Sequence, residues 1–267
     1  MTDIAVPSAA TATSFRTTPS DRAIQRATAA SSRVRDRDAP VRRAFIRSGD
    51  TQPPPVAHFL RGGRGGEVRL KLYLSLLWIA SNDPYETRFP SAIWAELMDL
   101  PDPDHLGARR VKDAIDWLED QGFVRTERRP GWPSMVYLLR ETGGSQPYEH
   151  PARSREPYVR LPAGFWSNGW LACLSGRAIA LLLILLDNQD YRNPSEPFWV
   201  SPRWARDTYA LSADTWTRGT QELREHGLIE VSRIPVSEEF GFSRLRNRYV
   251  LSAARLASAP CVFALLS

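Results

Sequence analysis

Arginine at every second position of one segment is the pattern in this sequence that most clearly suggests chemistry. Arg244, Arg246 and Arg248 fall within residues 244–251, whose alternation predicts a β-strand. Successive side chains of a strand point to opposite faces, so the three guanidinium groups would share one face and could contact phosphates. The alternative is a solvated edge strand whose charges prevent pairing with another chain. We favour nucleic acid.

A predicted helix over residues 213–226 carries side chains suited to DNA bases. At helical spacing Trp216, Thr220 and Leu223 point inward, which leaves a polar outer face. Threonine and glutamine can hydrogen-bond base edges, and arginine suits guanine O6 and N7. With the strands that follow, the candidate DNA-binding residues of this region are Ser212, Thr215, Thr217, Arg218, Gln221, Arg233, Arg244, Arg246 and Arg248.

The elements around these residues are predicted to form a winged helix-turn-helix. In that motif the second helix usually enters the major groove and the hairpin lies beside the DNA backbone. The expected order is a short strand, a helix, a turn, a second helix ended by Gly227, and two strands, over residues 199–201, 202–209, 210–212, 213–226, 228–234 and 244–251.

The same order occurs earlier, between residues 89 and 139, and indicates an internal repeat. Residues 89–95 resemble 199–205, and residues 118–124 resemble 223–229. The first copy has a longer turn between its two helices, a place where insertions are tolerated.

The first copy also contains candidate DNA-binding residues, but its charge is mixed. Asp113 and Asp116 lie near the expected groove face and should repel phosphate. A role in dimerisation or partner contact is therefore an equal alternative for this copy. Its candidate DNA-binding residues are Arg109, Arg110, Lys112, Arg128 and Arg129.

The expected fold class is α+β, mostly α, with two tandem winged helix-turn-helix domains after a disordered N-terminal tail. Residues 1–55 are rich in Ala, Thr, Ser, Pro and Arg and have few large apolar side chains, a composition typical of disorder. The arginines of this tail would either follow phosphates or solubilise it. The expected segments are the tail (1–55), a Pro/Gly-rich joint (56–66), the first winged-helix domain (67–142), a linker (143–157), the second winged-helix domain (158–252) and a C-terminal tail (253–267).

Composition narrows the function classes further. The chain of 267 residues has a net charge of +5, two cysteines and four histidines, and neither residue type shows metal-ligand spacing. We expect no metal or other cofactor. Because no catalytic constellation is visible, we expect neither an enzyme nor a small-molecule substrate. The most apolar run, residues 178–186, is too short for a membrane span and no signal segment is visible, so we expect a cytoplasmic protein without membrane contact.

Residues 60–74, LRGGRGGEVRLKLYL, followed by two helix-turn-helix units, resemble a family of helix-turn-helix proteins from actinobacteria. The resemblance covers roughly residues 55–252 and implies fold and class only. The domain plan is also similar to that of plasmid replication initiators.

Together these patterns predict a bacterial, sequence-specific double-stranded DNA-binding protein that regulates transcription, acting alone or as a homodimer. One alternative is a replication initiator or maintenance factor of a plasmid or other mobile element. Another is a winged-helix scaffold that contacts proteins without specific DNA binding.

Overall fold

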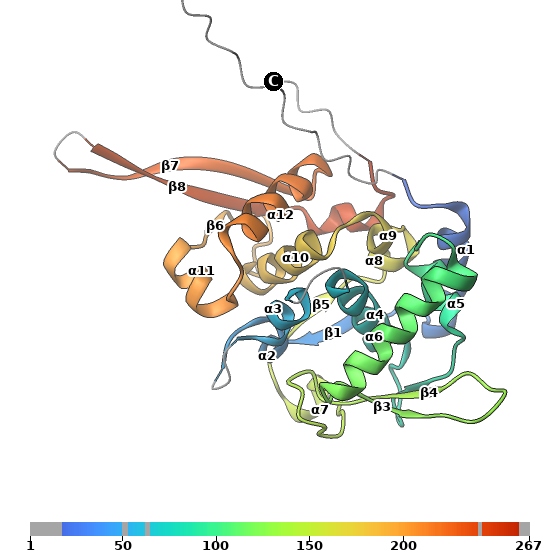
Figure 1. Cartoon of the computed structure of the whole chain (residues 1–267). Helices are drawn as coiled ribbons and strands as arrows, with labels where there is room; N and C mark the ends of the chain where they lie inside the picture. The colour runs from blue at the N-terminus through green and yellow to red at the C-terminus, as the bar shows by residue number, and fades with distance from the viewer. Residues whose placement is uncertain (1–17, 50–52, 62–64, 240–241, 262–267) are drawn as a thin grey trace, which may run out of the picture.

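The computed structural model describes residues 18–49, 53–61, 65–239 and 242–261. The fold is α+β: helices form the body, and the described residues add one two-stranded and two three-stranded sheets (Figure 1). None of the described helices is long and apolar enough to cross a bilayer.

Two stretches of the chain repeat one order of elements: a long helix, a short strand, two helices and a β-hairpin. The sheet orders are β2-β4-β3 and β6-β8-β7, with all pairs antiparallel. The predicted helices and hairpins are thus present in both stretches. The first unit comprises α4 (Gly66–Ile79), β2 (Glu86–Thr87), α5 (Ser91–Leu97), α6 (Ala108–Asp120), β3 (Val124–Glu127) and β4 (Met135–Leu138); the second comprises α10 (Gly176–Asn188), β6 (Phe198–Trp199), α11 (Pro202–Tyr209), α12 (Ala213–Glu225), β7 (Ile229–Glu239) and β8 (Phe242–Leu251).

The long helices α4 and α10 contact each other at the centre of the molecule. Both are buried on nearly every side, as expected for helices with apolar residues around their whole circumference. One hydrophobic cluster runs through the two units, and the two hairpins point away from each other on opposite sides of the body (Figure 1).

Local signals explain the helix boundaries in the second unit. The hydroxyl of Ser212 accepts a hydrogen bond from the backbone N–H of Thr215, 3.1 Å away, and so caps α12. Gly227, with φ of +66°, takes the left-handed conformation that ends it. In the first unit, the longer turn contains a π-helical segment, Pro103–Gly107, in which the Asp102 carboxylate accepts from the backbone N–H of Leu106.

The predicted disorder of the N-terminal tail is wrong for residues 18–49, while residues 1–17 lie outside the described part. This segment forms α1 (Asp21–Val34), β1 (Ala39–Arg42) and α2 (Arg43–Ile46). Strand β1 pairs antiparallel with β5 (Tyr158–Leu161). Phe45 and Ile46 are fully buried. The segment has too few apolar residues for a core of its own, but those it has enter the core supplied by the rest of the chain.

Several arginines of this segment are engaged inside the protein and do not form a phosphate-binding tail. Arg42 is buried and forms ion pairs with Glu141 and Glu156. Arg43 and Arg47 both pair with the buried carboxylate of Asp187 in α10. These contacts attach the segment to both units. Loss of one partner would leave a charge unpaired in the interior, which would be costly.

The predicted joint, linker and C-terminal tail are also packed where the structure describes them. Residues 56–60 of the joint lie in a helix that begins at Pro55, and residues 62–64 lie outside the described part. Phe59, Tyr148 and Leu256, one from each segment, are buried in the common core. The short helices of these regions are α3 (Pro55–Leu60), α7 (Pro151–Ser154) and a 3-10 turn, Ala253–Ala257; α8 (Gly164–Ser167) and α9 (Trp170–Cys173) lie within the predicted second domain.

Candidate nucleic-acid interface

Helix α12 is held on α10 by its inner face. Gly219 allows close approach, since a Cβ there would lie 3.1 Å from the carbonyl oxygen of Arg177. The buried carboxylate of Glu222 accepts hydrogen bonds from the backbone N–H and hydroxyl of Ser175, at 2.6 and 2.5 Å. Burial and the negative charge of Glu67 raise the pKa of Glu222, while the hydrogen bonds from Ser175 oppose the shift. No local sequence pattern marks this anchor, because Ser175 and Glu222 are 47 positions apart.

The predicted base-contacting residues of α12 divide into two groups. Ser212 and Thr215 are occupied at the helix start, where the Ser212 hydroxyl also donates to the Thr215 hydroxyl at 2.9 Å. They are better placed to fix the helix end than to contact bases. Thr217, Arg218 and Gln221 are exposed on the outer face, as predicted.

Two side chains on the outer face form weak contacts with other residues of α12. The guanidinium of Arg218 donates to Asp214 at 2.7 Å, with both side chains more than half exposed. The amide of Gln221 donates to Glu225 at 2.9 Å. Exposed pairs of this kind contribute little stability, so a competing ligand can replace them at low cost.

The pairing register places Arg246 and Arg248 on one face of β8. Arg248 lies opposite Ser232 and Trp199, and Arg246 lies opposite Ile234. The Arg246 guanidinium carbon stands 4.3 Å from the centre of the Trp199 ring. The predicted shared face is therefore present for these two arginines, and the side chain of Arg244 lies outside the described part of the chain.

Arg233 lies on the other face of the hairpin. Its partner in the register is Asn247, and Tyr249, two residues further along β8, turns to the same side and is buried. The hairpin arginines thus do not all belong to one surface, although Arg233 itself is exposed.

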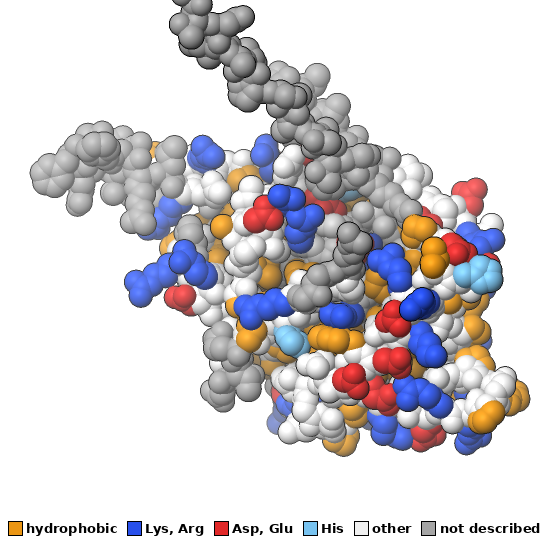
Figure 2. All heavy atoms as spheres, in the orientation of Figure 1, with side chains coloured by type: hydrophobic (Ala, Val, Ile, Leu, Met, Phe, Trp, Pro, Cys, Tyr) orange, Lys and Arg blue, Asp and Glu red, His pale blue; other side chains and the backbone are white. Residues whose placement is uncertain are grey.

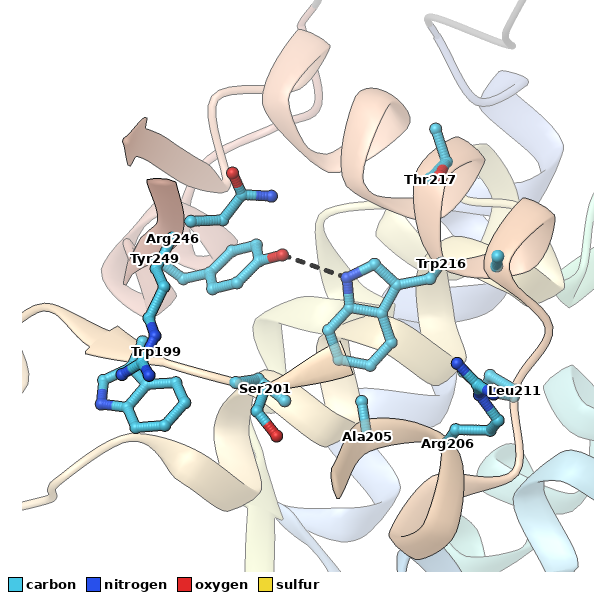
Figure 3. Close-up of a pocket in the computed structure, with 12 residues that line it drawn as sticks. Trp199, Ser201, Ala205, Arg206, Leu211, Trp216, Thr217, Arg246 and Tyr249 are labelled. Carbon is cyan, nitrogen blue, oxygen red and sulfur yellow. Dashed lines mark hydrogen bonds between the residues drawn. The ribbon is translucent and has the colours of Figure 1, made fainter. Parts of the chain in front are cut away.

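A pocket of about 580 Å³ lies between α11, the start of α12 and the strands β6 and β8 (Figure 3). The indole N–H of Trp216 donates to the Tyr249 hydroxyl at 3.1 Å on its inner wall. The residues that line it include the charged groups Arg206 and Arg246 and no carboxylate. No sequence pattern predicts this pocket, because residues such as Arg206 and Asn247 lie far apart in the chain.

In the first unit, the candidate residues lie beside acidic side chains. The Arg128 guanidinium donates to Asp116 at 2.8 Å and to Glu119 at 2.9 Å. Burial acts to raise the pKa of Glu119, but hydrogen bonds from Thr126 and the charge of Arg128 outweigh it, and the pKa is lowered. Arg128 therefore has two carboxylate partners within the unit, one of them only 28% exposed.

The remaining cations of the first unit are exposed but stand among acids. Arg109, Arg110, Lys112 and Arg129 have exposed side chains. Figure 2 shows Asp and Glu side chains intermixed with Lys and Arg over the part of the surface where α6 lies. The expected repulsion of phosphate near this helix agrees with that distribution.

The described residues contain no group of three or more His, Cys, Asp or Glu side chains arranged to hold a metal ion. No protein-family model matches the chain, and no curated protein matches it either.

Proposed function

We propose that this chain is a sequence-specific double-stranded DNA-binding protein that regulates transcription in the cytoplasm. Its two repeated units are interpreted as winged helix-turn-helix domains, of which the second is the principal DNA-binding unit. The observation that carries the proposal is the combination of a polar, exposed face on α12 with arginines on one face of the neighbouring strand β8.

The role of α12 follows from its exposed residues. A helix of this size fits the major groove, where an arginine can contact guanine O6 and N7 together and glutamine can contact adenine. Thr217, Arg218 and Gln221 are the residues we assign to this task. Ser212 and Thr215, which cap the helix, are assigned to positioning its N-terminus instead.

The role of β8 follows from the lack of internal partners for its cations. Among the described side chains, no carboxylate forms an ion pair with Arg246 or Arg248, whereas Arg128 of the other hairpin has two such partners. Unpaired arginines on one strand face suit contacts to successive phosphates, which hold the protein in register on the duplex.

The first unit supports a second candidate role, contact with a protein partner. Two of its hairpin arginines, Arg125 and Arg128, are paired with acids of the same unit, and the Arg125 guanidinium lies 2.7 Å from the Glu127 carboxylate. A surface of balanced charge has little net attraction for a polyanion, so we assign this unit to dimerisation or partner binding.

The test is selection of duplexes from a random library by the full chain at about 150 mM salt, where weak phosphate contacts are screened. Truncation at residue 55 is unsuitable because Phe45 and Ile46 belong to the core. Enrichment of one motif, lost in Arg218→Ala, would support the proposal, and the motif's symmetry would report a monomer or a homodimer. If the chain retains duplexes but enriches no motif, sequence-specific binding is overturned.

A further inference from the structure

The pocket between helix and hairpin has the lining of a ligand site; we call it the helix–wing pocket. Its defining residues are Trp199, Arg206, Trp216, Thr217, Arg246 and Asn247. Its volume of about 580 Å³ falls in the range of roughly 300–1,000 Å³ typical of small-molecule sites. Figure 3 shows Trp199 and Arg246 at one end, Arg206 at the other, and Trp216 between them.

The charge of the helix–wing pocket selects an anion. Arg206 and Arg246 line it, and no aspartate or glutamate does. Among the described residues, Arg206 forms no ion pair, although Arg203 on the same helix is paired with Asp207 at 3.9 Å. A guanidinium without an internal carboxylate is suited to a phosphate, which it can bind with two parallel N–H donors.

The aromatic lining selects a planar ring. Trp199 is 50% exposed, which is unusual for a side chain of this size, and the guanidinium of Arg246 already stacks on it. Trp216 is half-buried, with its N–H engaged by Tyr249. Any nucleobase can stack on tryptophan, since each base has a π-face. Asn247 and Thr217 add exposed hydrogen-bonding groups to the lining of the pocket.

We propose that the helix–wing pocket binds a nucleotide, with its base against Trp199 and its phosphate at Arg206. This arrangement uses both ends of the pocket and leaves Trp216 in contact with the middle of the ligand. The nucleotide can be a free mononucleotide or a residue of a single strand, since the recognising chemistry is the same. The binding itself stands apart from the proposed function.

One consequence does rest on the proposed function. Thr217 and Arg246 line the pocket and also belong to the surface assigned to duplex DNA. A ligand held there would occupy groups that the duplex needs, so nucleotide and duplex would compete. By linkage, each would weaken the other's binding by the same factor.

The experiment is calorimetric titration of the full chain with AMP, GMP, CMP and UMP, with adenosine and inorganic phosphate as partial ligands. Arg206→Ala should weaken mononucleotide binding at least about 10-fold, and Trp199→Leu about 5- to 100-fold. Arg203→Ala is the matched control on the same helix, outside the pocket, and should change affinity less than about 2-fold.

Two results would overturn the inference. One is the absence of mononucleotide binding by the parent chain at millimolar concentration, and the other is binding that neither pocket variant changes. Adenosine binding as tightly as AMP would overturn the phosphate assignment. Tighter binding of a short single strand, with the same response to both variants, would support the pocket and identify a strand as its source.

A further variant separates this inference from the proposed function. Arg248→Ala lies outside the residues that line the pocket and should weaken duplex binding while leaving AMP binding unchanged. Duplex binding without AMP binding would reject the inference alone. AMP binding without any specific duplex would reject the proposed function and leave the pocket in place.

Discussion

The two repeated units share one order of elements but differ in charge at two equivalent positions of their second helices. With Leu118 aligned to Leu223, Asp113 of α6 corresponds to Arg218 of α12, and Asp116 corresponds to Gln221. The hairpins differ in the same sense, because Arg128 is paired with acids while Arg248 is not paired with any described carboxylate. The fold is therefore separable from the surface that would contact DNA, and one copy can lose that surface without losing its structure.

The largest expected effect tests whether the two units remain one structural body. Leu118→Ala and Leu223→Ala remove equivalent side chains that are fully buried in a single hydrophobic cluster. Each should lower the free energy of unfolding by about 2–5 kcal/mol, because each leaves a cavity. Urea unfolding followed by circular dichroism and by tryptophan fluorescence should show one shared transition.

The exposed Leu106 supplies the control, since Leu106→Ala should change the free energy of unfolding by less than about 0.5 kcal/mol. Two separate transitions, with each buried variant affecting only one of them, would contradict a common core and make the units independent.

The next effect tests the charge difference between the helices directly. Arg218→Ala should weaken binding to the selected duplex by about 1–3 kcal/mol and relax preference at one base position. Asp113→Ala, at the equivalent place in α6, should cause no loss, because it removes a charge that repels phosphate. Fluorescence anisotropy with the selected duplex measures both. Equal losses from the two substitutions would mean that both helices contact bases.

A smaller effect concerns the hairpins. If Arg248 contacts a phosphate, Arg248→Ala should reduce the slope of log affinity against log salt by about one. Arg128→Ala should leave that slope unchanged, because its guanidinium is already bound by Asp116 and Glu119. Titrations at a series of salt concentrations give both slopes. An unchanged slope in Arg248→Ala would remove β8 from the interface.

Local patterns allowed much of the second unit to be predicted from sequence. A capping Ser212 and a stopping Gly227 bound α12 closely, and strict alternation placed Arg246 and Arg248 on one face. These features depend only on neighbouring residues, and so a single sequence contains them.

What could not be predicted depends on contacts between distant residues. The N-terminal segment has a composition typical of disorder, yet β1 pairs with β5 and Arg47 reaches Asp187, 140 positions away. The helix–wing pocket arises in the same way, whereas Arg128 is paired with residues only 12 and 9 positions away. Charge patterns along the sequence gave the arginines that could contact DNA, but not those that the protein uses internally.

The smallest effect separates the units by the pH dependence of their stability. The second helix of each unit carries one glutamate that is held by hydrogen bonds, and the pKa values of these two glutamates are shifted in opposite directions. The pKa of Glu119 is lowered: burial opposes this, but the hydrogen bonds from Thr126 and the charge of Arg128 prevail. Its stabilising contribution is complete above its ordinary pKa and is lost as the pH falls through the lower folded-state pKa.

The pKa of Glu222 is raised, first by burial and then by the charge of Glu67. Its protonated form favours folding, so its contribution is complete below the ordinary pKa and is lost as the pH rises through the raised folded-state value. The stability lost on Glu119→Gln should therefore grow between about pH 3 and pH 7, and that lost on Glu222→Gln should shrink over the same window. Urea unfolding at each pH measures both differences. Slopes of the same sign would show that the two carboxylates are held alike, and the electrostatic contrast between the units would then be confined to their surfaces.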